Sequence, residues 1–263
     1  MKWLSYAGSP RIGALLRRDQ TRPERTPALD KRAGIFHSLD NVANRTKFDL
    51  MNQMRGNPDR LHHAPDSSAA ALLLIDVIND LEFDGAEDLL PSAMKMATAL
   101  AVFKRRAKEQ GIPVIYVNDN FGRWRSDFPK LVEHCSREEA RGREIVIRLK
   151  PEDDDYFVLK PKHSAFFQTN LEILLDYLGA STVILTGMAA DICVLFSAND
   201  AYMRDFRIYI PPDCVASESD ERTRSALMLM QRVLKADISP STNLELENLV
   251  AAAKANKRQS ASG

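Results

Sequence analysis

Short apolar runs alternate with longer amphipathic stretches over most of the chain. The runs consist mainly of β-branched and aliphatic residues, a composition typical of strands that are buried on both faces of a parallel sheet. The stretches between them repeat apolar residues every three or four positions, which predicts helices. Because the two kinds of segment alternate, the pattern indicates an α/β fold with a parallel sheet and helices on both of its faces.

The same pattern places the individual elements. Strands are predicted for residues 69–75, 112–117, 156–159, 182–185 and 207–210. A further short strand or extended piece is predicted for residues 145–147. Helices are predicted for residues 92–110, 128–135, 169–178, 191–203, 218–235 and 243–253. Residues 121–127 read as a polar and aromatic loop. No repeat or internal boundary interrupts this part, so residues 66–263 are predicted to form one domain.

Residues 1–65 differ from the rest of the chain in charge and in pattern. They hold twelve Lys or Arg and six Asp or Glu, so this segment carries +6 and the remaining residues carry −6. A signal peptide is not expected, because no apolar core follows the first basic residue, and six acids argue against a transit peptide. We predict a mobile basic extension. The alternative is that translation of the natural protein begins near Met51 or Met54.

Composition narrows the class of protein. Hydrophobic residues make up 44% and charged residues 27% of the chain, as in ordinary globular proteins. The formal net charge is zero, which gives no electrostatic argument for a nucleic-acid or membrane partner. No apolar run reaches the roughly 18 residues that a membrane-spanning helix needs. Three cysteines without a Cys-x-x-Cys pair fit a reducing compartment, and we expect a cytoplasmic protein.

Three reactive side chains follow predicted strands from different parts of the chain: Asp76, Lys160 and Cys193. In an open α/β sheet, ligands bind at the carboxyl ends of the strands, so all three are predicted to lie at one edge. Cys193 also falls in the first turn of a predicted helix, where the helix dipole favours a thiolate. Taken singly, the three read as a capping aspartate, a surface lysine and a buried cysteine. Together they suggest a base, a positioning cation and a nucleophile.

At these positions the chain resembles the isochorismatase-like cysteine hydrolases, which include nicotinamidases and N-carbamoylsarcosine amidases. One block surrounds each reactive residue, and PPDCVASES resembles the turn that follows the next strand of the family. The resemblance covers residues 69–239, and its three blocks are LLLIDVINDLEF, LKPKHSAFFQTNLEILL and LTGMAADICVLFSANDAYM.

The resemblance implies a three-layer, doubly wound, Rossmann-like sheet of six mostly parallel strands. It also implies a cis peptide bond between Met188 and Ala189, and an oxyanion hole formed by the backbone N–H groups of Ala189 and Cys193. In the implied mechanism Asp76 takes the proton of Cys193, and the thiolate attacks an amide-like carbonyl. Asp76 then protonates the leaving amine and activates the water that hydrolyses the thioester. Lys160 holds Asp76 and the thiolate in place electrostatically.

The loop after the second predicted strand departs from the family and bears on the substrate. Nicotinamidases carry an Asp-x-His metal arrangement there, whereas this chain reads Asn-Asp-Asn-Phe-Gly over residues 118–122. Imidazole is the expected ligand of a zinc or iron site, so we predict no metal, no cofactor and a substrate other than nicotinamide. The candidate substrate-binding residues are Asn118, Phe121, Arg123 and Trp124. Arg125 and His163 are further candidates for substrate contact, although this loop could instead pack at a subunit contact.

Two functions of different classes remain open at this point. The first is a metal-independent cysteine hydrolase that cleaves a small amide, ureido or related carbonyl compound through a thioester. The second is a non-catalytic binding or scaffold protein on the same fold, with the basic extension contacting an acidic partner. The family resemblance implies a homo-oligomer, either a dimer or a tetramer. The intact trio of Asp76, Lys160 and Cys193 favours the enzyme, since a scaffold does not need the three together.

Overall fold

The computed structural model describes residues 68–119 and 127–251, and these residues contain a six-stranded parallel sheet. The strands are short runs of buried residues, and the strand order is β3-β2-β1-β4-β5, with β6 pairing the end of β4. Their bounds are β1 (Ala70–Ile75), β2 (Val114–Asp119), β3 (Tyr156–Lys160), β4 (Thr182–Met188), β5 (Arg207–Tyr209) and β6 (Val215–Ala216). Every pairing in the sheet is parallel, as the α/β pattern predicted.

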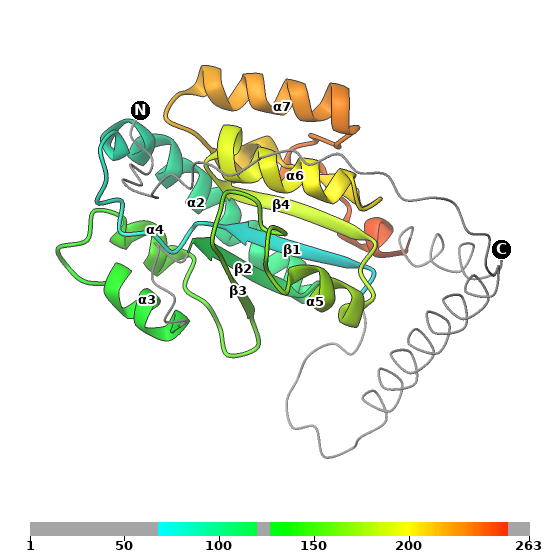
Figure 1. Cartoon of the computed structure of the whole chain (residues 1–263), viewed down its shortest axis with the longest axis horizontal. Coiled ribbons are helices and arrows are strands. Elements are labelled where there is room, and N and C mark those ends of the chain that lie inside the picture. The colour runs from blue at the N-terminus through cyan, green and yellow to red at the C-terminus, as the bar shows by residue number, and fades with distance from the viewer. Residues whose placement is uncertain (1–67, 120–126, 252–263) are drawn as a thin grey trace, which may run out of the picture. The chain divides into compact units, whose positions relative to one another are not determined.

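Helices cover both faces of the sheet, which gives the predicted three-layer, doubly wound arrangement (Figure 1). One face carries α2 (Ala86–Glu109), α3 (Phe128–Cys135) and α4 (Arg143–Arg148). The other face carries α5 (Leu171–Leu178), α6 (Leu195–Tyr202) and α7 (Asp220–Leu234). Short helical turns lie at Ala190–Val194, Pro212–Cys214 and Ser241–Asn243, and residues 246–251 are helical.

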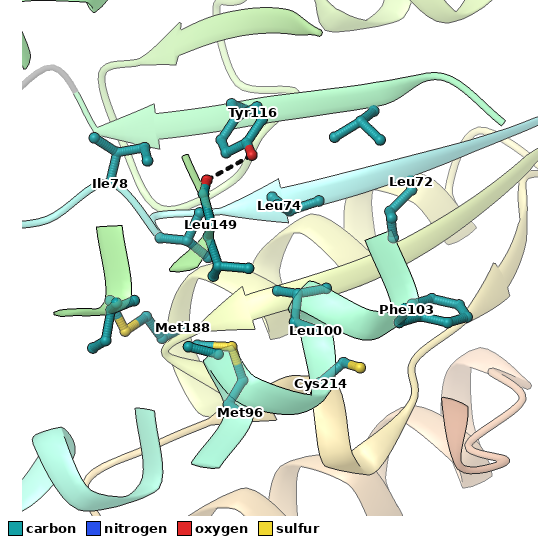
Figure 2. Close-up of a cluster of buried hydrophobic side chains, with 14 of the residues drawn as sticks. Leu72, Leu74, Ile78, Met96, Leu100, Phe103, Tyr116, Leu149, Met188 and Cys214 are labelled. Carbon is teal, nitrogen blue, oxygen red and sulfur yellow. Dashed lines mark hydrogen bonds between the residues drawn. The ribbon is translucent and has the colours of Figure 1, made fainter. Parts of the chain in front are cut away.

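Alternating side chains of β1 build two separate cores, because successive residues of a strand point to opposite faces. Leu72 and Leu74 pack toward α2, whereas Leu73 and Ile75 pack toward α5, α6 and α7. Figure 2 shows the first of these cores, in which the Tyr116 hydroxyl donates a hydrogen bond of 2.7 Å to the Leu149 carbonyl. The two cores enclose the central strands, so β1 and β4 are packed on both faces.

The prediction of a strand at residues 145–147 was wrong, since these residues lie in α4. Ile145 and Val146 are buried in the core beside α2, while Ile147 is 45% exposed. This burial pattern fits a helix that is buried on one side and exposed on the other. Tertiary packing here overrides the strand preference of the β-branched side chains. The sixth strand of the sheet is instead β6, which consists of only two residues.

Other predicted boundaries shifted by a few residues. The helix predicted to begin at residue 92 begins at Ala86, and Pro91 lies inside it. The helix predicted for 191–203 is divided into a π-helical turn, Ala190–Val194, and α6. The helix predicted for 243–253 is preceded by a 3₁₀ turn, and its described part covers 246–251.

Two further observations concern the chain as a whole. It divides after residue 61 into two units, Met1–Leu61 and His62–Gly263. Residues 1–65, predicted to form a basic extension, lie outside the described residues. Among the helices that the structure describes, none combines the length and the apolar character that crossing a membrane requires.

Candidate active site

Asp76, Lys160 and Cys193 meet at the carboxyl edge of the sheet, where the sequence predicted them. Asp76 directly follows β1, Lys160 is the last residue of β3, and Cys193 lies in the turn after β4. The Lys160 Nζ atom lies 2.8 Å from Asp76 Oδ2 and 3.5 Å from Cys193 Sγ. The lysine side chain is fully buried, and the cysteine is only 9% exposed. A carboxylate, an ammonium and a thiol therefore share one largely water-free site.

The backbone around Asp76 fixes the direction of its carboxylate. Asp76 has a left-handed φ of 55°, a conformation that aspartate adopts more readily than most residues. The backbone N–H of Asp119, at the end of β2, donates to Asp76 Oδ1 over 2.7 Å. Lys160 Nζ contacts the other oxygen and also donates to the Lys162 carbonyl over 3.2 Å. Both carboxylate oxygens of Asp76 thus have partners before any substrate arrives.

The turn that carries Cys193 is irregular. The peptide bond between Met188 and Ala189 is cis, at the position that the family resemblance implies. The Ala189 carbonyl then accepts hydrogen bonds from the N–H groups of Ile192 and Val194, both at 3.1 Å. These bonds close the π-helical turn Ala190–Val194, which places Cys193 beside Lys160.

A charged cluster from the following elements holds this turn in place. Asp191 accepts a hydrogen bond from the Ser217 hydroxyl at 2.7 Å and pairs with Arg222 Nε at 2.6 Å. Arg222 lies in the first turn of α7 and also contacts Glu218. The turn that carries Cys193 is therefore tied to Ser217, just after β6, and to α7 through side chains, in addition to its own backbone bonds.

The surroundings of Cys193 oppose the bias toward thiolate that its helix-end position gives. Burial, followed by the nearby Asp76 carboxylate, raises the pKa of the Cys193 thiol well above its usual range, although Lys160 acts in the opposite direction. Burial alone would lower the pKa of Lys160, but Asp76 and Cys193 together raise it, so the lysine stays charged. The helix-end position of Cys193 was visible in the sequence, whereas its burial beside a carboxylate was not.

The candidate substrate-binding residues have different outcomes. Asn118 is fully buried, and its amide nitrogen donates to the Ile78 carbonyl over 2.8 Å, so it supports the loop after β1. His163 does lie at the site, with its Nδ1 atom 3.9 Å from Cys193 Sγ. The remaining candidates, Phe121, Arg123, Trp124 and Arg125, lie outside the described residues.

The other two cysteines are buried away from these groups. Burial raises the pKa of Cys135 to about 12 and that of Cys214 further still, and both pack in the core next to α2. Within the described part of the chain, no three His, Cys, Asp or Glu side chains are grouped so as to hold a metal ion.

Sequence reasoning missed several contacts of the site. Asp119 ends β2 with its carboxylate 3.9 Å from Lys160 Nζ, and the strand-end rule that identified Asp76 applies to it equally. Arg222 had no comparable signal, because a helical arginine some thirty residues after the nucleophile is ordinary in any surface helix. Phe196, whose ring lies 5.6 Å from that of His163, likewise reads as an ordinary residue of α6.

Comparison with known proteins places this arrangement in one family. The model of the Isochorismatase domain matches residues 70–239. The chain is 45% identical over 169 residues to the uncharacterized isochorismatase family protein YaaI of Bacillus subtilis, covering 64% of this chain and 92% of the relative.

Two solved structures are similar in fold and in sequence. The N-carbamoylsarcosine amidase of Thermoplasma acidophilum aligns with a TM-score of 0.53 and 30% identity, covering 67% of this chain and 98% of that one. The pyrazinamidase/nicotinamidase of Streptococcus mutans aligns with a TM-score of 0.51 and 28% identity, covering 64% and 99%. The matched domain contains all six strands and Asp76, Lys160 and Cys193, so the chain belongs to the isochorismatase family of hydrolases.

Proposed function

We propose that the protein is a metal-independent cysteine hydrolase that cleaves a small amide or ureido compound through a thioester on Cys193. One observation carries this proposal: a buried, charged Lys160 lies 2.8 Å from the Asp76 carboxylate and 3.5 Å from the Cys193 sulfur. Burying an ion pair is costly, and neither core needs charge at this edge. An ion pair between Lys160 and Asp76 at this position is explained if its two charges act on the Cys193 thiol.

The resting proton distribution supports the order of steps. The raised pKa of Cys193 keeps the thiol protonated, and the adjacent Asp76 is the base that removes this proton as the sulfur attacks the carbonyl carbon. Lys160 compensates the negative charge that passes from the carboxylate to the sulfur. The backbone N–H groups of Ala189 and Cys193 stabilise the oxyanion. The C–N bond then breaks, Asp76 returns the proton to the leaving nitrogen, and a thioester remains.

Amide chemistry is favoured over the vinyl-ether chemistry of isochorismatase itself, because cleavage of a vinyl ether does not need a cysteine nucleophile. Two structural relatives are described as amidases. β2 ends with Asn118 and Asp119 and leads into Asn120, and this stretch lacks the histidine that a zinc or iron site at this place needs. From the family resemblance we further propose a cytoplasmic homo-oligomer, either a dimer or a tetramer.

The test is a panel of small amides and ureido compounds offered to the wild type and to Cys193→Ala. We expect ammonia or amine release by the wild type, a transient adduct that peptide mapping places on Cys193, and loss of turnover by at least about a thousandfold in the variant. A substrate that Cys193→Ala turns over at the wild-type rate would refute the thioester route. If compounds bind without either adduct or turnover, the non-catalytic binding function is correct instead.

A further inference from the structure

Asp191 is the only charged residue of the turn Ala190–Val194, which carries Cys193. Its Oδ1 atom accepts a hydrogen bond from the Ser217 hydroxyl at 2.7 Å, and its backbone N–H donates to the same hydroxyl oxygen over 3.3 Å. Ser217 is fully buried, and its carbonyl accepts the Ser92 hydroxyl of α2 at 2.7 Å. Asp191 is therefore fixed through both its backbone and its side chain by a residue that is itself anchored.

Arg222 binds the second oxygen of this carboxylate. Its Nε atom lies 2.6 Å from Asp191 Oδ2, and its guanidinium also contacts Glu218. Arg222 is the third residue of α7, and its backbone N–H donates to the Ser219 hydroxyl, which caps the helix, over 3.2 Å. The Asp191 and Arg222 side chains are 19% and 31% exposed, so solvent screens this pair less than an ion pair on the open surface. Helix α7 thus contacts the turn through a directed, charge-assisted hydrogen bond.

The turn needs accurate placement in the proposed function, because its backbone supplies part of the oxyanion hole. The N–H of Cys193, one of the two proposed donors, lies two residues after Asp191. Donors of this kind act only when they lie about 2.7–3.1 Å from the position of the oxyanion. Two of the bonds that close the turn end on one atom, the Ala189 carbonyl oxygen. A side-chain anchor at Asp191 therefore adds a second fixed point close to the Cys193 N–H.

From these contacts we infer that Arg222 is a positioning residue that acts through Asp191 to aim the Cys193 N–H at the developing oxyanion; this rests on the proposed function. Among the described residues, its guanidinium pairs with Asp191 and with a carboxylate just before α7, and with none of the three reactive side chains. The charged groups that shift the pKa of the Cys193 thiol are Asp76 and Lys160. Arg222 therefore assists the step that places charge on the carbonyl oxygen, and leaves the reactivity of the resting sulfur unchanged.

The experiment compares two reactions of Cys193. Acetylation by p-nitrophenyl acetate passes through an oxyanion and is followed by nitrophenol release, whereas alkylation by iodoacetamide displaces iodide and forms no oxyanion. Peptide mapping assigns both products to Cys193. The variants are Arg222→Gln, Asp191→Asn and the double variant that combines them. Arg204→Gln is the matched control, because Arg204 is also 31% exposed and pairs with Glu172 at 2.9 Å.

We expect Arg222→Gln to be acetylated at least about tenfold more slowly than the wild type, since loss of an oxyanion donor costs about a hundred- to a thousandfold and a misdirected donor forfeits part of that gain. Alkylation should stay within about threefold of the wild-type rate, because the charges next to the sulfur are retained. Asp191→Asn should show the same selective loss of acetylation. The control should match the wild type in both reactions.

The double variant tests whether Arg222 acts through Asp191. Adding Arg222→Gln to Asp191→Asn should slow acetylation by less than about twofold, because the two residues form one interaction. Losses that multiply, acetylation of Arg222→Gln at the wild-type rate, or equal slowing of acetylation and alkylation overturn the inference and leave the proposed function intact. A wild type that never acetylates Cys193 overturns both. Circular dichroism shows that each variant compared is folded; where Arg222→Gln does not fold, Asp191→Asn carries the comparison of the two reactions.

Discussion

Asp76 and Lys160 occupy a buried position beside the Cys193 sulfur, and their charges decide which group holds the proton at rest. Without the carboxylate, the ammonium at 3.5 Å from the sulfur would favour a thiolate. With the carboxylate present, 2.8 Å from the same ammonium, much of that positive charge is neutralised, and burial raises the pKa of the thiol further. In the proposed function, the site therefore keeps a protonated Cys193 next to Asp76, its base.

Replacing Asp76 with Asn tests this account. The change removes the carboxylate that raises the pKa of Cys193 while keeping Lys160, which lowers it, so the sulfur should ionise more readily. We expect alkylation of Cys193 by iodoacetamide at pH 7 to become at least about tenfold faster, since a fall of one unit in pKa raises the thiolate fraction tenfold. Turnover should be lost, because no base remains to carry the proton to the leaving nitrogen.

The measurement is the rate of alkylation, followed by peptide mapping so that Cys135 and Cys214 are excluded. Removing one partner of a buried ion pair also destabilises the fold, by about 3–5 kcal/mol, so a thermal melt should accompany each rate. Alkylation that slows in Asp76→Asn would contradict the arrangement described above, because it would mean that the carboxylate assists ionisation of the resting thiol.

Sequence alone could identify the three candidate reactive residues, but not the protonation state of Cys193. Asp76, Lys160 and Cys193 each follow an apolar run, and the strand-end rule brings them together without any coordinates. The charge on the sulfur depends on burial and on a 2.8 Å ion pair, neither of which is encoded in residue spacing. Asn118 illustrates the same limit: its amide nitrogen bonds the Ile78 carbonyl, while its Oδ1 atom is buried without a partner among the described residues, and residue spacing predicts neither.

At the scale of elements, the close contact between β1 and β4 positions the two ends of the active site. Ile75 pairs with Gly187 in this register, so the residue before Asp76 lies beside the residue before Met188. Gly187 has a φ of +105°, and a Cβ atom there would overlap the Ile75 carbonyl oxygen and its backbone neighbours.

The long strands could be predicted from their apolar runs, whereas α4 and β6 could not. In α4, tertiary packing overrides the strand preference of the β-branched residues. A two-residue strand such as β6 is too short to show a periodic pattern.

Gly187→Ala should be far more harmful than Gly111→Ala, although both glycines have positive φ. Gly111 has a φ of +66° and open space where a Cβ atom would be built. Its substitution costs only the backbone strain of about 1–3 kcal/mol. At Gly187 the overlap with Ile75 adds about 1–3 kcal/mol more and pushes β1 away from β4.

Chemical denaturation of both variants gives the difference in their free energies of unfolding. We expect Gly187→Ala to lose roughly 2–6 kcal/mol, combining the two costs, and any protein that folds to show slowed acylation of Cys193. Equal losses in the two variants would show that the strand contact contributes nothing beyond the backbone conformation.

At the scale of the whole molecule, the described residues contain the six-stranded sheet, both cores and the three reactive side chains. The matched Isochorismatase domain begins at residue 70, which is where β1 begins. Each of the six strands of this sheet lies within residues 70–216. Composition could mark residues 1–65 as different from the rest, but a charge of +6 alone does not identify what that segment contacts.

A chain that begins at residue 66 should therefore fold and retain the chemistry of Cys193. We expect its melting temperature to lie within about 2 °C of that of the full chain, which is less than the shift that 1 kcal/mol causes in a domain of this size. Acetylation of Cys193 by p-nitrophenyl acetate should proceed at the same rate, because Asp76, Lys160 and His163 are all retained. The net charge changes from zero to −6, so the shortened chain should bind an anion exchanger more strongly. A shortened chain that unfolds, or that loses acetylation while folded, would show that residues 1–65 support the domain or its site, and would join the basic segment to the hydrolase as one functional unit.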